Sequence, residues 1–301
     1  MKKKLVSLLC AAVLAVSLTA CSAKTETTAD SADSAAQASE SDAADGSTTA
    51  SAAESADASE EETASLHFSD DGITVQSGSA DGCEIDGTAL TISAAGTYRL
   101  SGSCTNGSVT VEKEVTDVTL LLDALSLSST ETAPILCKKS SEVCILAADG
   151  SESTLSDAAA NNTDANPDNA ENAVICCKDS SQVTLCGTGA LTILANGKNG
   201  ISSGDDASLT IRELALSITA PVNDAINAKN LLDLESGTLV ISAADDAVHC
   251  DYTLNVGMDG TDGPIIQITD CCEGLEAAEL NIYSGTITIQ STDDCLNAAN
   301  S

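Results

Sequence analysis

Short stretches in which apolar and polar residues alternate run through the second half of the chain. Alternation with a period of two is the pattern of a β-strand whose side chains point to opposite faces of a sheet. The strands predicted in this way cover residues 209–211, 216–218, 238–241, 280–282 and 287–289. Glycine-containing triplets, such as those at 236–238 and 284–286, separate them as turns. Helical periodicity is absent from this half, so the pattern predicts an all-β fold.

A six-residue phrase recurs between these strands. It contains two polar, mostly acidic residues, then a small, an aliphatic, a polar and a small residue. Clear copies lie at 223–228, 245–250, 272–277 and 293–298, with a weaker copy at 198–203. The aliphatic positions are Ile201, Ile226, Val248, Leu275 and Leu296, which are 25, 22, 27 and 21 residues apart. A period in the low twenties with short strands predicts a parallel β-helix with two or three strands per rung.

The first half of the chain predicts the same architecture. Alternating strands are expected at 90–92, 97–100, 108–111, 118–122 and 143–146. Residues 135–146 recur at 175–186, an offset of 40 residues that is too long for one plain rung. The polar stretch 157–172 is therefore predicted to be an inserted loop that makes up the difference.

Residues 1–20 are predicted to be a lipoprotein signal peptide. Three lysines precede an apolar run, Leu5 to Leu18, that is too short for an ordinary membrane span. The sequence Leu18-Thr19-Ala20-Cys21 resembles the bacterial lipobox, which implies cleavage before Cys21 and lipidation of its thiol. A plain secretory signal is the alternative. Two acyl chains anchor a protein stably, so we expect an extracytoplasmic protein that is lipid-anchored to the cell membrane or cell surface.

Two further segments follow the signal peptide. Residues 21–65 begin with the lipidated cysteine and consist mainly of Ser, Ala, Thr, Asp and Glu, a composition that predicts a disordered acidic tether. Residues 66–301 are predicted to form the β-helix domain. Because a fresh repeat opens at 293–298, we expect either that the natural protein is longer or that another chain covers this end. The alternative is that residues 297–301 fold back as a minimal cap.

The charge of the chain excludes one class of partner. The whole sequence has a formal net charge of −34, and removal of 1–20 leaves 9 basic and 46 acidic residues, a net charge near −37. Such a chain cannot neutralise phosphates, so nucleic acid and anionic membrane surfaces are not expected partners. Divalent cations and neutral or cation-bridged polymers fit this composition.

Four segments in order, 89–102, 118–127, 183–193 and 245–251, resemble a known family. They are similar to the extracellular carbohydrate-binding β-helix proteins of clostridia and related bacteria. The resemblance implies a right-handed parallel β-helix like that of pectate lyases, bound calcium, binding of cellulose or acidic polymers such as polygalacturonate, and no demonstrated catalysis. This chain departs from the family where Ala247 and Cys295 replace an expected glycine.

The acidic positions of the repeated phrase are the predicted metal ligands. If the rungs stack in register, Asp224, Asp246, Glu273 and Asp294 form a column, with Asp245 and Asp293 beside it. Neighbouring rungs are about 4.8 Å apart, where two carboxylates repel by about 3.5 kcal/mol at an effective dielectric constant of 20. Calcium, which accepts six to eight oxygen ligands, would relieve this repulsion. The alternative is that the carboxylates are solvated and screened by salt.

Two other groups of residues are candidates for cation binding and for catalysis. The loop acids Asp164, Asp168 and Glu171 are a second candidate cation site, and the alternative is a flexible, solvated insertion. Asp245, Asp246 and His249 resemble the acid/base groups of β-helix pectin hydrolases, so a lyase or hydrolase acting on uronate polymers is the alternative function. No catalytic residue is predicted, however, because the phrase repeats with Asn227, Glu276 and Asn297 in place of the histidine. A passive surface or adhesion protein is the third alternative.

The positions of the aromatic and cysteine residues predict where their side chains lie. The chain after the signal has only Phe68, Tyr98, Tyr252 and Tyr283 as aromatics. We expect the three tyrosines to be half-buried strand residues rather than stacking platforms for sugars. Among its cysteines, Cys250 and Cys295 are expected to fill small core positions as free thiols. Cys137 and Cys177 align across the 40-residue offset and are predicted to lie within disulfide range.

Overall fold

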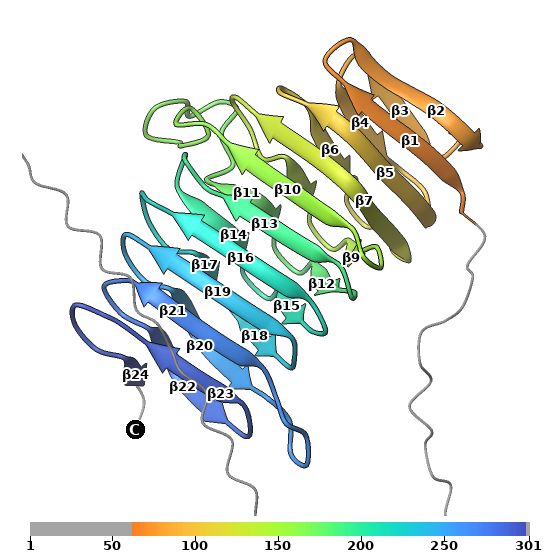
Figure 1. Cartoon of the computed structure of the whole chain (residues 1–301). Helices are drawn as coiled ribbons and strands as arrows, with labels where there is room; N and C mark the ends of the chain where they lie inside the picture. Colours follow the sequence, from red (N-terminus) through yellow and green to blue (C-terminus); the bar gives the residue numbers. More distant parts are fainter. Residues whose placement is uncertain (1–61, 299–301) are drawn as a thin grey trace, which may run out of the picture. The chain divides into compact units, whose positions relative to one another are not determined.

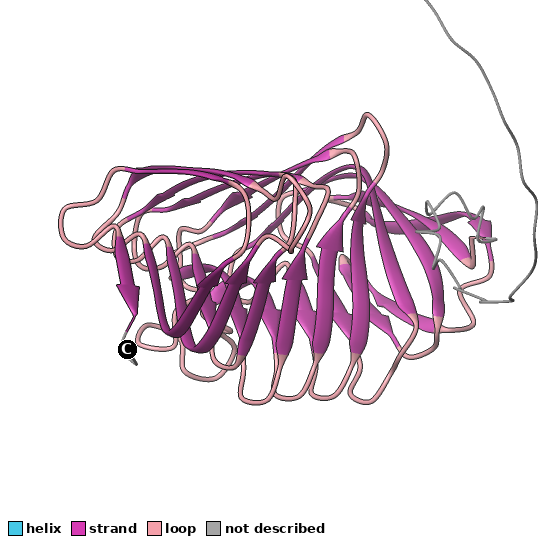
Figure 2. Cartoon of the chain, turned by 90° about the horizontal axis from the view of Figure 1, so that it is seen from below, coloured by secondary structure: helices cyan, strands magenta, loops and turns pink. Residues whose placement is uncertain are grey.

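The protein is described by a computed structural model that places residues 62–298 (Figure 1). Every regular element among these residues is a β-strand (Figure 2). None of the described residues belongs to a helix that is long and apolar enough to cross a membrane. The predictions for the signal peptide, for lipidation at Cys21 and for most of the tether fall outside the described residues.

The described part of the chain contains twenty-four strands, numbered in chain order. They are β1 (Ala64–Ser69), β2 (Gly72–Gly78), β3 (Cys83–Asp86), β4 (Ala89–Ile92), β5 (Gly96–Cys104), β6 (Ser108–Val111), β7 (Val118–Ser129), β8 (Ile135–Cys137), β9 (Glu142–Ala147), β10 (Glu152–Asp157), β11 (Ala173–Cys177), β12 (Gln182–Cys186), β13 (Ala190–Leu194), β14 (Asn199–Ser203), β15 (Ser208–Ile211), β16 (Ala215–Ala220), β17 (Ile226–Ala228), β18 (Leu231–Leu234), β19 (Thr238–Ala243), β20 (Val248–Val256), β21 (Ile265–Asp270), β22 (Leu275–Ile282), β23 (Thr286–Ile289) and β24 (Leu296–Ala298).

Parallel pairing arranges the strands in three sheets that run along the coil. The first sheet follows β4, β6, β8, β11, β14, β17, β20, β22 and β24. The second follows β1, β5, β7, β9, β12, β15, β18, β20 and β22. The third follows β5, β7, β10, β13, β16, β19, β21 and β23. The long strands β5, β7, β20 and β22 belong to two sheets, because each bends where one sheet meets the next. The strands make a β-solenoid of about eight turns, as the sequence predicts.

The ladder pairs the residues that define the repeat. Ile201 pairs with Ile226, Ile226 with Val248, Val248 with Leu275, and Leu275 with Leu296. The two segments that are 40 residues apart also pair in register: Ile135 pairs with Ile175 and Cys137 with Cys177. The prediction that unequal spacings describe one stacked repeat is therefore confirmed.

Inward-facing side chains stack into one continuous apolar core. Leu209, Leu232 and Leu254, for example, occupy the same position in successive rungs and are fully buried. Burying one such side chain contributes about 1.5–3 kcal/mol relative to leaving it exposed. No rung can bury its inward face alone, so stability comes from the contact between rungs.

Cysteines occupy several small core positions. Cys137, Cys177 and Cys250 are at most 1% exposed and are free thiols. A hydrogen bond with Cys137, together with burial, raises the pKa of Cys177 well above its usual value. Cys295 is exposed, so the prediction that it fills a core position is wrong. It lies in the turn before β24, where no further described rung packs against it.

The amino-terminal end of the solenoid contains antiparallel pairs that the periodicity did not predict. Strand β1 pairs antiparallel with β2, and β3 pairs antiparallel with β4. Strand β1 also continues the second sheet by pairing parallel with β5. It begins at Ala64, slightly before the predicted domain boundary at 66, because Ala64 is buried opposite Tyr98. Arg99 Nε donates to Glu62 Oε1 at 2.7 Å beside this strand.

The polar stretch after β10 holds no strand and connects β10 to β11. Its base is held by Asp157, whose side chain is 5% exposed. Asp157 Oδ1 accepts hydrogen bonds from the amides of Asn196 at 2.6 Å and Gly197 at 3.0 Å, and Oδ2 accepts from Asn161 Nδ2 at 2.8 Å. These contacts tie the loop to the next rung without changing the register of the ladder.

Candidate functional site

The acidic turn residues lie at the corner between the third and first sheets. Asp224, Asp246, Glu273 and Asp294 each stand two residues before a paired aliphatic position, so they occupy equivalent places in successive turns. Their surroundings differ sharply. Asp224 is 4% exposed, Asp246 and Glu273 are half-buried, and Asp294 is exposed. The neighbouring Asp245 and Asp293 are also exposed.

Asp224 is held by donors from its own turn and the next one. Its Oδ2 accepts from Asn227 Nδ2 at 2.6 Å, and its Oδ1 accepts from the amide of Asp246 at 3.2 Å. Burial raises the pKa of Asp224, and these two hydrogen bonds oppose that rise. Similarly, Asn297 Nδ2 donates to Glu273 Oε2 at 2.9 Å. Amide donors therefore separate some of the carboxylates that would otherwise repel one another.

His249 lies at the centre of a charged cluster on the outer face of the first sheet. Its Nδ1 is 2.6 Å from Glu276 Oε2 and 3.4 Å from Asp246 Oδ2. Its Nε2 is 2.9 Å from Asp251 Oδ1, and Asp251 also accepts from Lys229 Nζ at 2.9 Å. Burial lowers the pKa of His249, but the hydrogen bonds to Asp251 and Glu276 outweigh it, so the pKa is raised.

Asp246 is the most perturbed carboxylate of this cluster. Burial and the nearby charges of Asp224, Asp245 and Glu276 raise its pKa to about 6. A carboxyl group with such a pKa can hold or release a proton near neutral pH. Asp246 and His249 are therefore placed to exchange protons near neutral pH.

Two groups among the described residues bring three potential metal ligands within 4.8 Å of one another. One is Asp246, His249 and Glu276, and the other is Asp245, Asp246 and Cys272. Of the six predicted ligands, only Asp245 and Asp246 belong to these groups of three. In the inserted loop, Glu171 forms an ion pair with Lys178.

A groove of about 410 Å³ crosses the outer face of the first sheet, next to the histidine cluster. Its rims carry Lys198 on one side and Lys178 and Lys229 on the other, and Ser202 and Asn227 lie between them. We call it the lysine groove. The described residues contain only eight lysines and arginines, and three of these eight line this one groove. Further amides line it at Asn172, Asn199 and Asn223.

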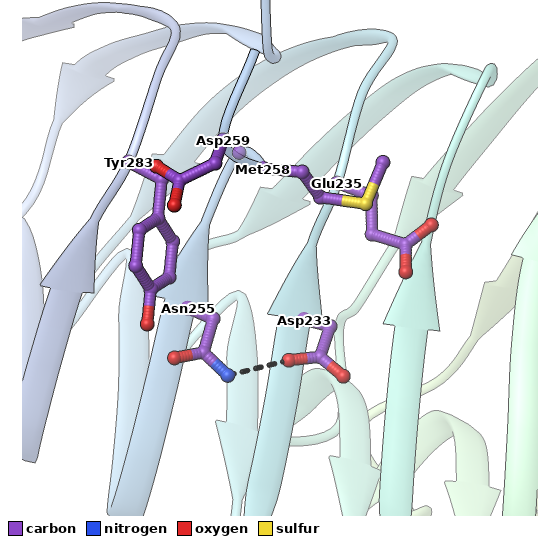
Figure 3. A pocket seen from close by; sticks show the side chains of 7 residues that line it. Asp233, Glu235, Asn255, Met258, Asp259 and Tyr283 are labelled. Atoms are coloured by element: carbon purple, nitrogen blue, oxygen red, sulfur yellow. Dashed lines mark hydrogen bonds between the residues drawn. The ribbon is translucent and has the colours of Figure 1, made fainter. Parts of the chain in front are cut away.

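A second groove, of about 380 Å³, lies on the second sheet (Figure 3). We call it the tyrosine groove; Asp233, Glu235, Asn255, Met258, Asp259 and Tyr283 line it. Asn255 Nδ2 donates to Asp233 Oδ1 at 2.8 Å, which is the dashed line in Figure 3.

The aromatic side chains divide into two groups, which corrects the prediction that the tyrosines are half-buried. Phe68 and Tyr98 are fully buried, and Tyr98 Oη donates to the carbonyl of Ala94 at 3.0 Å. Tyr252 and Tyr283, in contrast, are 65% and 52% exposed. Tyr252 lies at the bend of β20 and Tyr283 follows the end of β22, so neither belongs to a strand position with regular alternation.

Sequence reasoning missed the lysine groove, although the repeat contains a signal for it. Lys178 and Lys229 both stand three residues after an aliphatic repeat position, at Ile175 and Ile226. In a stacked coil, residues that follow the aliphatic repeat position by the same number of residues lie at the same corner. Glu276 was noted only as the residue that replaces the histidine, whereas the register places it against His249.

The fold and these grooves define a β-solenoid with open polar grooves along its outer faces. A family of carbohydrate-binding domain-containing proteins matches residues 86–270, and the chain belongs to this family. A carbohydrate-binding domain-containing protein of Acetivibrio thermocellus is 33% identical over 149 residues, which are 49% of this chain and 50% of that protein. The chain thus matches about half the length of this curated relative.

The fold is also similar to a solved structure. A gadolinium derivative of the polysaccharide lyase-like protein from C. thermocellum superposes with a TM-score of 0.52 at 22% sequence identity. The match covers 78% of this chain and 99% of that one. At this identity the similarity is one of fold.

Proposed function

We propose that this protein binds an acidic polysaccharide, such as polygalacturonate, in the lysine groove and does not cleave it. The observation that carries the proposal is the gathering of Lys178, Lys198 and Lys229 on one groove of a chain with a net charge of −34. The family supports carbohydrate as the ligand. The three ammonium groups support a ligand that carries carboxylates, and Glu171 and Asp179 line the same groove.

The groove offers the two kinds of contact that a uronate needs. The ammonium groups can contact carboxylates, and the side chains of Ser202, Asn199 and Asn227 can exchange hydrogen bonds with sugar hydroxyls. Lys198 lies opposite the other two lysines, so charges on successive sugars can alternate between the rims. Lys178 and Lys229 are already paired with Glu171 and Asp251. A ligand carboxylate would therefore compete with these ion pairs, which favours several weak contacts along a polymer over one tight one.

We further propose that calcium assists this binding. The exposed carboxylates Asp245, Asp293 and Asp294 lie on the corner beside the first sheet, with Asp246 and Glu273 next to them. A divalent cation held by some of these groups can also accept oxygens from a uronate polymer. We also propose that a lipid on Cys21 anchors the protein to the outer side of the membrane.

The test is binding of the full chain to immobilised polygalacturonate, with cellulose beside it, in calcium and in chelator. The double variant Lys198→Gln, Lys229→Gln should weaken polygalacturonate binding at least tenfold. Lys113→Gln with Lys139→Gln removes the same charge from two exposed lysines outside the groove and should bind like the parent. Equal loss in both variants would mean that the groove is not the site. No binding to any polysaccharide would leave the passive surface-protein alternative.

The tyrosine groove supports cellulose as the other ligand. Exposed tyrosine rings can pack on the flat face of a sugar, and carboxylate and amide groups around the ring can bind hydroxyls. Tyr283→Ala should reduce cellulose binding and leave polygalacturonate binding unchanged if the two grooves act separately.

The histidine cluster favours an enzyme as the second candidate function. Asp246, with its pKa near 6, and His249 are placed for proton transfer, and Glu276 supplies a further carboxylate. A lyase or hydrolase would release unsaturated product or reducing ends from polygalacturonate. If such product appears and disappears in His249→Ala and in Asp246→Asn, the non-catalytic proposal is wrong.

A further inference from the structure

Two cysteine side chains meet on the outer face of the second sheet. Cys144 on β9 pairs with Thr184 on β12, so Cys186, two residues further along β12, shares its outward face. The two sulfur atoms are 3.4 Å apart. Cys144 is half-buried and lines a shallow groove, whereas Cys186 is 5% exposed. A small molecule in the groove therefore meets the sulfur of Cys144 first.

The surroundings of this pair favour a thiolate at Cys186. The hydrogen bond between the two sulfurs lowers the pKa of Cys186 to about 7 although burial opposes it, and the charge of Arg212 acts in the same direction. The thiolate is the nucleophile in thiol chemistry. Exchange with disulfides is fastest when the pKa of the attacking thiol is near the ambient pH.

The core pair Cys137 and Cys177 shows the opposite behaviour. These residues face inward and are at most 1% exposed. Their mutual hydrogen bond and burial raise the pKa of Cys177 well above its usual value, so it stays a neutral thiol. The two pairs of thiols both connect neighbouring rungs, but they differ in solvent access and in the charge of their sulfur atoms.

We propose that Cys144 and Cys186 form a reversible redox site that closes to a disulfide by exchange with a small-molecule disulfide, RSSR. Cys144, the more accessible sulfur, passes its proton along the hydrogen bond to the thiolate of Cys186 as it attacks one sulfur of RSSR, which forms a mixed disulfide and releases RS⁻. Cys186 then gives up this proton, and its thiolate attacks the sulfur of Cys144 and releases a second RS⁻. The two cysteines are oxidised, RSSR is reduced, and the two protons that the cysteines lose convert the released thiolates to two RSH.

The geometry also indicates how the bridge behaves. The sulfurs must approach from 3.4 Å to about 2.05 Å. Because diagonal neighbours in a sheet are about 7–8 Å apart, closing the bridge also requires a local shift of the backbone of β9 or β12. Cys186 is the diagonal neighbour of Cys144 rather than its direct partner, so the bridge spans a longer distance than neighbouring side chains that face each other. Such bridges are easily reduced. Once formed, the bridge joins two rungs across the 42-residue separation that includes the inserted loop.

The test uses the full chain, fully reduced, and oxidised glutathione as the probe at neutral pH. Samples are quenched with acid, alkylated and digested with trypsin. The expected product is peptide 140–178 joined to peptide 179–198, with a mass two hydrogens below their sum, formed before Cys295 is modified and reversed by dithiothreitol. Because peptide 140–178 also contains Cys176 and Cys177, Cys177→Ala serves as the control and should keep the cross-link.

Two variants separate the steps. Cys186→Ser should stop at the mixed disulfide, so Cys144 carries one glutathione and no cross-link forms. Cys144→Ser should form neither product. The proposal is overturned if wild-type Cys144 and Cys186 stay reduced, if they react no faster than the exposed Cys295, or if the mixed disulfide persists without closing.

Discussion

Asn227 and Asp224 form a side-chain hydrogen bond of 2.6 Å within one turn of the solenoid. The same carboxylate accepts the amide of Asp246 from the next turn, so one buried group joins two rungs. This shows how the acidic column is accommodated. Its carboxylates are partly separated by donors that the repeated phrase itself supplies, and the most exposed ones stay available for cations.

Asp224→Ala should destabilise the protein. It removes the acceptor of two donors in a buried position, and each unsatisfied buried donor costs about 1–3 kcal/mol. Asp224→Asn keeps one acceptor oxygen and should cost less. The free energies of unfolding in urea for both variants and the parent check this. Equal stability of the alanine variant and the parent would contradict the structural role.

The histidine cluster should make stability depend on pH. His249 has a raised pKa, so its favourable interactions are complete below its unfolded pKa of about 6.5 and are lost as pH rises through the folded value. Asp246 is protonated more readily in the native state, so its contribution also falls as pH rises from about 4 to about 6. Both groups therefore favour the folded state more at acidic pH.

The measurement compares His249→Asn with the parent, since asparagine occupies the same position in neighbouring rungs at Asn227 and Asn297. The loss of stability should be larger at pH 5.5 than at pH 8.5. Taking the difference between variant and parent removes the general effect of protonating the many other carboxylates. A loss that does not change with pH would show that His249 is not charged in the folded protein.

Excess calcium should raise the melting temperature relative to chelator. A cation that binds only the native state adds about 2.7 kcal/mol at 100 times its dissociation constant. Asp245→Asn with Asp246→Asn should abolish most of this shift. Asp81→Asn with Glu84→Gln changes the same charge on exposed residues of the amino-terminal end and should keep it. Identical melting curves of the parent in calcium and chelator would refute the calcium proposal.

Gly237→Ala should destabilise the corner before β19 strongly. Gly237 has φ of +93°, and a Cβ atom there would lie 2.4 Å from the carbonyl oxygen of Leu214. Gly150 also has a positive φ, of +65°, but has open space around it. Gly150→Ala should therefore cost only the conformational term of about 1–2 kcal/mol, and Gly237→Ala more. Thermal unfolding of both variants checks the difference, and equal losses would mean that the close contact relaxes.

Cys21→Ala should release the protein from membranes, because it removes the predicted lipid attachment site. Cys10→Ala, inside the predicted signal peptide, should have no such effect. Phase partitioning in detergent, with a labelled fatty acid, measures both. If the Cys21 variant still carries the label and enters the detergent phase, the lipid-anchor prediction fails.

The sequence predicted the ladder because its determinants are local and repeated. The pairing of Ile226, Val248 and Leu275 follows from the spacing of one phrase, and an aliphatic residue must face inward at each copy. The antiparallel pairing of β1 with β2 occurs once, so no repetition marks it. Cys295 follows the repeat, but no further described rung packs against it, so its exposure depends on its neighbours and not on its own position in the phrase.

The candidate sites were harder to predict because they depend on residues where strands bend or end and on contacts between different rungs. Alternation assigns a strand residue to the inside or outside, but Tyr252 and Tyr283 lie where strands bend or end. The lysine groove joins residues from three successive rungs whose charges look isolated along the chain. His249 was recognised as a possible acid or base, but its contact with Glu276 requires the register between β20 and β22.

The insertion between β10 and β11 shows that the register between strands does not depend on the number of residues that connect them. One rung holds residues 158–172 as an excursion at its corner, yet Ile135 and Ile175 still pair directly. Chain length at this corner is therefore decoupled from the rest of the coil. A foreign peptide grafted between Thr163 and Glu171 would leave every later rung in place, which makes this solenoid a scaffold for displaying sequences at a defined height along its axis.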